Sequence, residues 1–138
     1  METQNFDTDK KILYVDDDEM ALDTLFQLLK KHFSIDIAQT PKEALSLVKK
    51  KNYDAILMDI GLGFDINGIE LARMIRDYKD YKNKPIIAVT SYASKRDERF
   101  FLSHGLDYYI AKPFFKNKLI SLLEKVLAKN FEGQGATV

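Results

Sequence analysis

Short apolar runs alternate with longer amphipathic runs five times along this chain, and no other feature constrains its fold as strongly. Polar or turn residues flank each short run, as is usual for β-strands. The predicted strands are Lys11–Val15, Ile35–Ala38, Ala55–Met58, Ile86–Val89 and Tyr108–Ile110. The predicted helices are Met20–Phe33, Lys42–Lys51, Ile69–Tyr78, Ser94–His104 and Phe114–Lys129. Strict alternation implies right-handed crossovers, so the sequence predicts an α/β fold whose parallel sheet is covered on both faces.

Turn and cap residues support this division into elements. Thr40 stands before Pro41, which suits a helix N-cap followed by proline at the first helical position. Gly105 stands where a glycine usually ends a helix. We therefore expect one domain at residues 11–129, with a flexible segment at 1–10 and a flexible tail at 130–138.

Composition narrows the class of protein. Lys plus Arg total 21 and Asp plus Glu total 21, so no bulk charge attracts nucleic acid or an acidic membrane surface. The chain has no cysteine, which excludes disulfides, zinc–thiolate sites and thiol nucleophiles. No apolar run resembles a signal peptide or a membrane span. We therefore expect a cytoplasmic protein without a direct nucleic-acid or membrane partner.

Residues that can carry chemistry follow four of the predicted strands. Asp16, Asp17, Asp18 and Glu19 follow the first strand, Asp59 the third, Thr90 and Ser91 the fourth, and Lys112 and Pro113 the fifth. In an open parallel sheet the ligand site lies beyond the carboxyl ends of the strands. Three acids, a hydroxyl and a lysine are therefore expected to share one pocket.

Charge indicates what such a pocket binds. Asp16, Asp17 and Asp59 would repel one another, and each would raise the pKa of the others. A hard divalent cation relieves this repulsion, and a site with oxygen ligands only suits Mg²⁺. Lys112 and the cation can neutralise a phosphoryl group at Asp59, whose carboxylate can act as a covalent nucleophile. The sequence therefore predicts a phosphoryl-accepting site.

Each residue also has an ordinary structural explanation. Acids after a strand often cap the next helix, and an Asp shortly before Gly61 is often a turn residue. Thr90 alone fits a strand-end hydroxyl, and Lys112 alone fits a solvated loop lysine. The phosphoryl site is favoured because all of these explanations would have to hold at one edge of the sheet.

Four segments together resemble the receiver domains of two-component response regulators. They are Ile12-Leu13-Tyr14-Val15-Asp16-Asp17-Asp18, Ile56-Leu57-Met58-Asp59, Ile87-Ala88-Val89-Thr90-Ser91 and Tyr109-Ile110-Ala111-Lys112-Pro113-Phe114. The resemblance covers 11–129 and implies a flavodoxin-like (βα)5 three-layer sandwich with sheet order 2-1-3-4-5. It also implies a phospho-acceptor switch rather than a multiple-turnover enzyme.

The resemblance implies which residues bind the metal and the phosphoryl group. Asp59 would be the phospho-acceptor. Asp17 and Asp59 would bind Mg²⁺ directly, Asp16 would act largely through a metal-bound water, and Gly61 would offer its backbone carbonyl. A sensor histidine kinase or a histidine phosphotransfer protein would be the phosphoryl donor.

Other residues receive switch roles from the same resemblance. Thr90 and Lys112 would contact phosphoryl oxygens, and Tyr109 would be the aromatic residue whose rotamer reports the active state. The bond before Pro113 would be cis, which is uncommon for X–Pro bonds. The 94–129 face would bind a downstream protein or a second copy of the chain. If the chain is complete, it would be a single-domain regulator that acts through protein contacts.

One segment departs from the family pattern. Receivers usually have a Met-Pro pair after the acceptor, whereas this chain has Gly63 at the expected proline position and one extra residue before Gly68. Glycine in place of proline makes a loop less stiff. The backbone metal ligand and the partner surface near this loop are therefore less well defined by the resemblance than Asp59 is.

Three other functions fit parts of the sequence. A haloacid-dehalogenase-like phosphatase would use the Asp-x-Asp spacing in Asp16-Asp17-Asp18, but it needs a late acidic pair that the segment around Lys112 does not offer. A flavodoxin-like FMN site needs a first loop that cradles a phosphate, and the acidic first loop would repel it. A pure interaction module would have no need of the acids, the hydroxyl and the lysine together.

Overall fold

Five parallel strands form one sheet in the computed structural model, which describes residues 9–63, 65–91 and 94–128. The strands are β1 (Lys11–Val15), β2 (Ser34–Ala38), β3 (Ala55–Asp59), β4 (Ile86–Thr90) and β5 (Tyr108–Ala111). The helices are α1 (Glu19–Leu29), α2 (Pro41–Lys50), α3 (Gly68–Arg76), α4 (Lys95–Ser103) and α5 (Lys116–Ala128), with a 3₁₀ turn, η1, at Lys79–Tyr81. The strand order is β2-β1-β3-β4-β5, so the predicted fold class and sheet order are confirmed.

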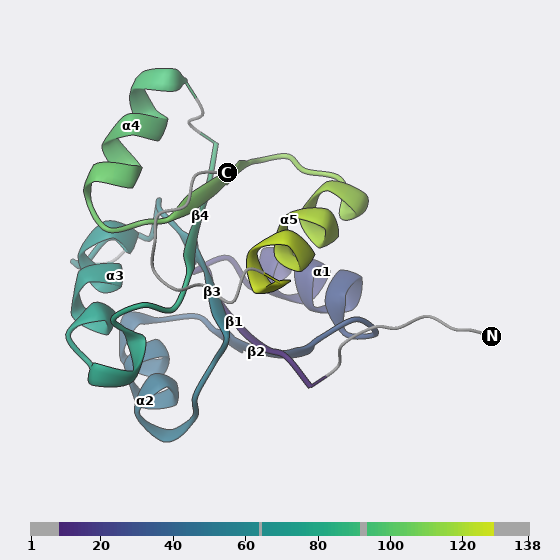
Figure 1. Ribbon diagram of the computed structural model, residues 1–138, viewed down its shortest axis with the longest axis horizontal. Helices are drawn as coiled ribbons and strands as arrows, with labels where there is room; N and C mark the ends of the chain where they lie inside the picture. The colour runs from purple at the N-terminus through teal and green to yellow at the C-terminus, as the bar shows by residue number, and fades with distance from the viewer. Residues whose placement is uncertain (1–8, 64, 92–93, 129–138) are drawn as a thin grey trace.

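Helices cover both faces of the sheet, with α1 and α5 on one face and α2, α3 and α4 on the other (Figure 1). Alternating residues of β1 supply the two cores. Ile12 and Tyr14 pack on the α1–α5 side, while Leu13 and Val15 pack on the opposite side. The central strands β3 and β4 are buried along their whole length, as parallel strands under two helical layers are. Apolar packing on both faces fixes the positions of the strand ends, where the polar residues lie.

Cap residues begin and end the helices as their sequence signals indicated. The side chain of Thr40 accepts the Glu43 amide 3.1 Å away, and Pro41 is the first residue of α2. Gly105 follows α4 with a φ of 96°, a left-handed conformation that glycine adopts without strain. Ser94, predicted as the first residue of a helix, is instead the N-cap of α4.

One predicted helix end is wrong by four residues, and the predicted start of α5 is wrong by two. Helix α1 ends at Leu29 rather than Phe33, because the His32 and Phe33 amides both turn back to the Leu29 carbonyl before the chain enters β2. Phe33 is buried, so tertiary packing rather than helix periodicity explains its apolar character. Helix α5 begins at Lys116 rather than Phe114. Lys129 and the segments 1–8 and 130–138, for which we expected a helix end and flexible termini, lie outside the described residues.

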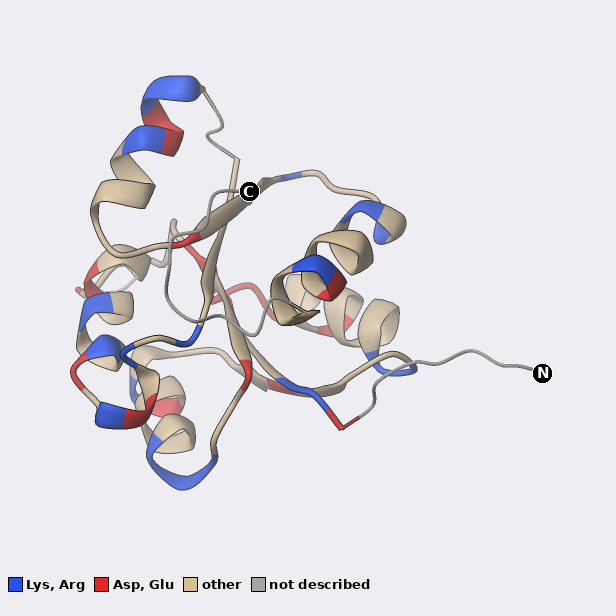
Figure 2. Ribbon diagram, in the orientation of Figure 1, with Lys and Arg blue, Asp and Glu red and all other residues tan. Residues whose placement is uncertain are grey.

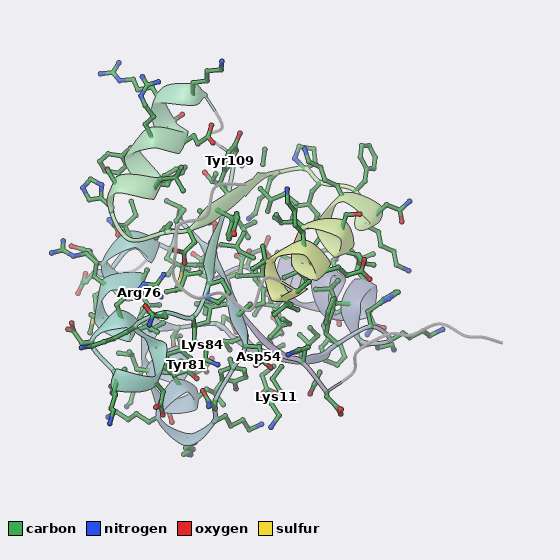
Figure 3. All side chains as sticks on the ribbon, in the orientation of Figure 1. Lys11, Asp54, Arg76, Tyr81, Lys84 and Tyr109 are labelled. Carbon is green, nitrogen blue, oxygen red and sulfur yellow. The ribbon has the colours of Figure 1, made fainter. Side chains whose placement is uncertain are left out.

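A polar network closes the end of the sheet that lies away from these strand ends, where Lys11, Asp54, Arg76, Tyr81 and Lys84 gather (Figure 3). One guanidinium nitrogen of Arg76 donates to the carbonyls of Tyr81, at 2.9 Å, and Lys84, at 2.5 Å. The other donates to an Asp107 carboxylate oxygen at 2.5 Å. One side chain at the end of α3 thus joins the connection into β4 to the connection into β5.

Acidic and basic side chains are interspersed over the helices that Figure 2 presents. The first half of α4 shows this mixture, with exposed Lys95 and Arg99 beside an acidic first turn. None of the helices in the described part of the chain is long and apolar enough to cross a membrane.

Candidate functional site

Three aspartates meet at the carboxyl end of two neighbouring strands. Strands β1 and β3 pair directly, with Val15 opposite Met58, so the residues that follow these two positions are brought together. One carboxylate oxygen from each of Asp16, Asp17 and Asp59 lies within 4.8 Å of the other two. Asp16 is 1% exposed and Asp59 is 7% exposed. The predicted convergence of the acids is therefore found in the structure.

The donor set of this cluster fits a hard divalent cation. All three side chains offer carboxylate oxygens, which Mg²⁺ and Ca²⁺ prefer over nitrogen or sulfur ligands. Two of these carboxylates are buried and Asp17 is partly exposed, and their mutual repulsion is unfavourable, so a cation would stabilise the cluster. Asp16, Asp17 and Asp59 could hold such an ion.

Lys112 adds a positive charge to the cluster from the end of the edge strand β5. It directly follows β5, and its amide donates to the Thr90 carbonyl at 2.8 Å. Its Nζ lies 3.3 Å from Asp16 Oδ2 and 3.6 Å from Asp59 Oδ1. The Lys112–Pro113 peptide bond is cis, as the family resemblance implied. Lys112 is thus a partner of the acids rather than a solvated loop lysine.

The environment of Asp59 favours its protonated form. Burial raises the pKa of Asp59 to about 6, and the negative charge of Asp16 acts in the same direction. Lys112 and the Gly61 amide, which donates to Asp59 Oδ1 at 3.2 Å, oppose this rise in pKa. Asp59 is therefore a carboxylate whose ionised form gains much from any added positive charge.

Each oxygen of Asp16 already has a hydrogen-bond donor. The Asp18 amide donates to Oδ1 at 3.0 Å, and the hydroxyl of Tyr14 donates to Oδ2. Tyr14 is 1% exposed, and burial followed by its bond to Asp16 raises the pKa of the phenol, so the hydroxyl keeps its proton. Sequence reasoning did not identify Tyr14. The signal was present, because residues two apart on a strand share a face and a buried tyrosine needs a partner for its hydroxyl.

The loop that departs from the family pattern supplies a donor to Asp17. The Gly63 amide donates to Asp17 Oδ2 at 3.0 Å. Proline at this position has no amide hydrogen, so this bond depends on the departure from Met-Pro. Gly68 is needed for another reason, because a Cβ there would collide with the backbone of Asp59. Residue 64, within the same loop, lies outside the described residues.

Thr90 and Tyr109 lie on the α4 side of the sheet. Thr90 ends β4 and is 2% exposed, and its strand neighbour on β5 is Ala111. Tyr109 is half-buried and packs against the core cluster that contains Phe101 of α4. Side-chain alternation from Ala88 puts Thr90 on the same face as Tyr109. Figure 3 shows Tyr109 near the carboxyl end of the sheet, far from Arg76.

The ordinary explanation holds for two acids of the first loop. Asp18 is the N-cap of α1, with its carboxylate accepting the Met20 amide at 3.1 Å, and Glu19 lies in the first helical turn. Asp16 and Asp17 instead face Asp59. The acidic run therefore divides into one pair for the helix and one pair for the site.

Comparison with known proteins gives one family. Residues 12–124 match the response regulator receiver domain family. The polar-differentiation response regulator DivK of Brucella ovis is 32% identical over 120 residues, which cover 86% of this chain and 96% of DivK. The chain is thus similar to DivK over nearly the whole length of both proteins.

Solved structures agree with the sequence comparison. The chemotaxis protein CheY4 of Vibrio cholerae matches with a TM-score of 0.80 and 25% identity, covering 85% of this chain and 98% of CheY4. A CheY-like response regulator receiver domain protein of Methanospirillum hungatei matches with a TM-score of 0.77 and 33% identity, covering 87% of this chain and 94% of that protein. Fold, acid cluster and sequence similarity therefore all lead to the same kind of protein.

Proposed function

The chain belongs to the response regulator receiver family, and from that premise we propose that Asp59 accepts a phosphoryl group. A receiver is a signalling switch of a two-component system. The observation that carries the proposal is the position of Asp59, a buried acid within 4.8 Å of two other carboxylates and 3.6 Å from the ammonium of Lys112. This arrangement combines a nucleophile with charge that can offset an incoming phosphoryl group.

We further propose that the cation is Mg²⁺, held by Asp16, Asp17, Asp59 and the backbone carbonyl of Gly61. When bound, it would supply positive charge beside the phosphoryl oxygens and reduce the repulsion among the three acids. The oxygen-only donor set supports this choice.

The chemistry at Asp59 is a phosphoryl transfer. A carboxylate oxygen of Asp59 forms a bond to phosphorus while the N–P bond of a phosphohistidine breaks, and the imidazole leaves with the electron pair. Since the pKa of Asp59 is about 6, the nucleophile is largely ionised at neutral pH. The ammonium of Lys112 and the hydroxyl of Thr90 are proposed to bind phosphoryl oxygens, so positioning and charge carry most of the catalysis.

The phosphoryl donor is proposed to be a sensor histidine kinase or a histidine phosphotransfer protein, and it must reach the carboxyl end of the sheet. A cleft of about 490 Å³ lies there, lined in part by Tyr14, Met20, Lys112 and Phe114. Met20 is 77% exposed beside this cleft, and Phe115, the residue after Phe114, is 82% exposed. Exposed apolar side chains next to a polar site suit a protein that docks while it delivers a phosphoryl group.

The output surface is proposed to be the 94–129 face, formed in the described residues by α4, β5 and α5. A downstream protein or a second copy of the chain would bind there. Movement of Thr90 towards a phosphoryl oxygen would vacate space for the Tyr109 ring, which packs against the core cluster that contains Phe101 of α4. We take residues 11–129 as the receiver domain, which includes the matched residues 12–124.

Membership in the receiver family excludes the dehalogenase-like phosphatase and the FMN-binding protein as alternatives. A receiver that binds partners without being phosphorylated remains the alternative to test. Phosphorylation of Asp59 distinguishes the two functions, since an interaction module would take up no phosphoryl group.

Intact-mass spectrometry tests the proposal. With Mg²⁺ and acetyl phosphate, the protein is expected to gain the mass of one phosphoryl group. Asp59→Asn should abolish this adduct, while Asp80→Asn, which changes an exposed aspartate of η1, should keep it. An adduct that persists undiminished in Asp59→Asn would show that another residue is the acceptor.

A further inference from the structure

The hydrogen bond between Tyr14 and Asp16 gives a role to a residue outside the expected site. Tyr14 lies two positions before Asp16, which directly follows β1 and still donates its amide to the Ala38 carbonyl at 3.1 Å, so both side chains point to the same side. The phenol is buried against α1 and borders the cleft that also contains Lys112. Its hydroxyl donates to Asp16 Oδ2, so an apolar core residue is joined directly to the acid cluster.

We propose that Tyr14 is a positioning residue, whose hydroxyl fixes the orientation of the Asp16 carboxylate and so raises the affinity of the acid cluster for a divalent cation. The inference rests on the cation site of the proposed function. It goes beyond that function because it assigns a contribution to a residue that would itself touch neither the cation nor the phosphoryl group.

The donors around Asp16 show why the phenol is suited to this role. Lys112 also approaches Oδ2, at 3.3 Å, but it carries a positive charge that repels a cation and is shared with Asp59. The phenol is neutral and repels no cation. If Lys112 turns towards a phosphoryl group, Oδ2 keeps the phenol and Oδ1 keeps the Asp18 amide. Tyr14 is thus the side-chain donor that stays on Asp16 Oδ2 when Lys112 turns away.

The expected loss of cation affinity on removing the Tyr14 hydroxyl follows from the general behaviour of metal sites. Removing a hydrogen-bond partner of a metal ligand typically lowers metal affinity about 10- to 100-fold, because the ligand is no longer held in its binding orientation. A buried tyrosine with a purely structural role behaves differently. Loss of its hydroxyl lowers the stability of the fold but leaves the affinity of the folded protein for a cation unchanged.

The chain contains a matched control for this test. Tyr53 is also 1% exposed, and its hydroxyl donates to a carboxylate oxygen of Asp36 at 2.5 Å. Asp36 lies on β2 and is not part of the acid cluster. Tyr53→Phe therefore removes the same kind of bond from an equally buried tyrosine, away from the site.

The experiment is a titration of the full chain with Mg²⁺, followed by amide NMR shifts, together with melting curves recorded without metal. Tyr14→Phe is expected to weaken Mg²⁺ binding about tenfold or more, and Tyr53→Phe to leave it within about twofold of wild type. In an Asp16→Asn background, adding Tyr14→Phe should cause less than about a twofold further loss, because the phenol acts through Asp16.

Several outcomes would overturn the inference. Unchanged affinity in Tyr14→Phe, or equal losses in both tyrosine variants, would leave the phenol a structural role only. A full loss that persists in the Asp16→Asn background would mean that Tyr14 acts by another route. If the wild type itself binds no Mg²⁺, the proposed cation site fails as well, so the two failures are distinguishable.

A measurement on the wild type needs no variant. The Tyr14 hydroxyl proton is buried and so protected from exchange with water. It is expected to give a downfield proton resonance with and without saturating Mg²⁺. Disappearance of this resonance on adding Mg²⁺ would show that cation binding breaks the bond to Asp16, and the inference would be wrong.

Discussion

Asp59 is under two opposing requirements. As the proposed nucleophile it must be ionised, yet burial and the charge of Asp16 raise its pKa to about 6. At neutral pH the folded protein therefore keeps a carboxylate in an environment that favours the neutral acid. The positive charge of a bound cation would offset the unfavourable ionisation of Asp59. The buried carboxylate that destabilises the free protein therefore increases the stabilisation that cation binding provides.

This conflict gives a pH-dependent stability. The folded pKa of Asp59 lies above its unfolded value of 3.8, so the folded state holds more protons between pH 4 and 6. The favourable contribution of Asp59 is complete below about pH 4 and is lost as the pH rises through about 6. Without metal at pH 7.5, Asp59→Asn is therefore expected to be more stable than wild type by about 2–3 kcal/mol, at 1.36 kcal/mol per pKa unit.

Urea denaturation in the presence of EDTA, repeated from pH 7.5 down to pH 4, measures this difference. The advantage of Asp59→Asn should shrink as the pH falls, and Asp80→Asn is the control for losing one aspartate elsewhere. A wild type at least as stable as Asp59→Asn at pH 7.5 would contradict the raised pKa of Asp59.

Single residues divide into those that the sequence revealed and those that only packing reveals. The strand-end rule identified Asp16, Asp17, Asp59 and Lys112, because parallel strands must end at the same edge. Tyr14 was missed because a tyrosine in an apolar run indicates only a core residue. The bond from Gly63 to Asp17 could not be foreseen either, because the path of a glycine-containing loop is not determined by its sequence pattern.

At the scale of elements, Arg76 ties the end of α3 to the starts of β4 and β5, two strands that also pair in the sheet. It ends α3, binds carbonyls in the connection to β4, and pairs with Asp107 before β5. Asp107 in turn accepts the Ile86 amide at 2.8 Å. The end of α3 and the starts of β4 and β5 are thus fixed by one guanidinium group.

Arg76→Ala is expected to lower the free energy of unfolding by about 2 kcal/mol, the usual scale for losing hydrogen bonds to a charged group that is partly buried. Urea denaturation at constant pH measures this loss. Arg73→Ala, an exposed arginine one turn earlier in α3, should change stability by less than about 0.5 kcal/mol. Equal effects of the two variants would mean that the network around Arg76 contributes no specific stability.

Element types were easier to predict than element ends. Each predicted strand and helix is present in the described residues, since apolar periodicity reflects which side of an element is buried. The predicted end of α1 at Phe33 was wrong because Phe33 is apolar for tertiary reasons. Strands β3 and β4 extend one residue further than predicted, to Asp59 and Thr90, because polar residues can still pair at a strand end.

At the scale of the whole molecule, the site and the proposed output face meet at β5, which carries Tyr109 and is followed by Lys112. Thr90 ends β4 one residue after the partner of Asp59, while Tyr109 on β5 packs against the core cluster that contains Phe101 of α4. A phosphoryl group can shift the molecule between two states only by its differential affinity for them, and coupling of about 1–3 kcal/mol is typical. Residues 94–128 are therefore the region where a signal from Asp59 is expected to be read.

Beryllofluoride, which mimics the phosphoryl group on an aspartate, tests this coupling. Together with Mg²⁺ it is expected to perturb amide resonances of α4, β5 and α5 as well as those around Asp59. The Asp59→Asn variant is the control and should show neither set of changes. Perturbations that stay within the pocket would mean that this face does not report phosphorylation, and the Gly61–Gly68 loop would be the next surface to test.

The order in which the site is completed has a consequence for protein synthesis. The acids come from adjacent strands near the start and middle of the chain, but Lys112 follows β5, 96 positions after Asp16. A nascent chain released as far as β4 can gather the carboxylates but still lacks the ammonium group beside them. If Asp59 accepts phosphoryl groups as proposed, ribosome-bound chains are poor substrates for the donor. Competence to accept a phosphoryl group would then arrive only with the last strand.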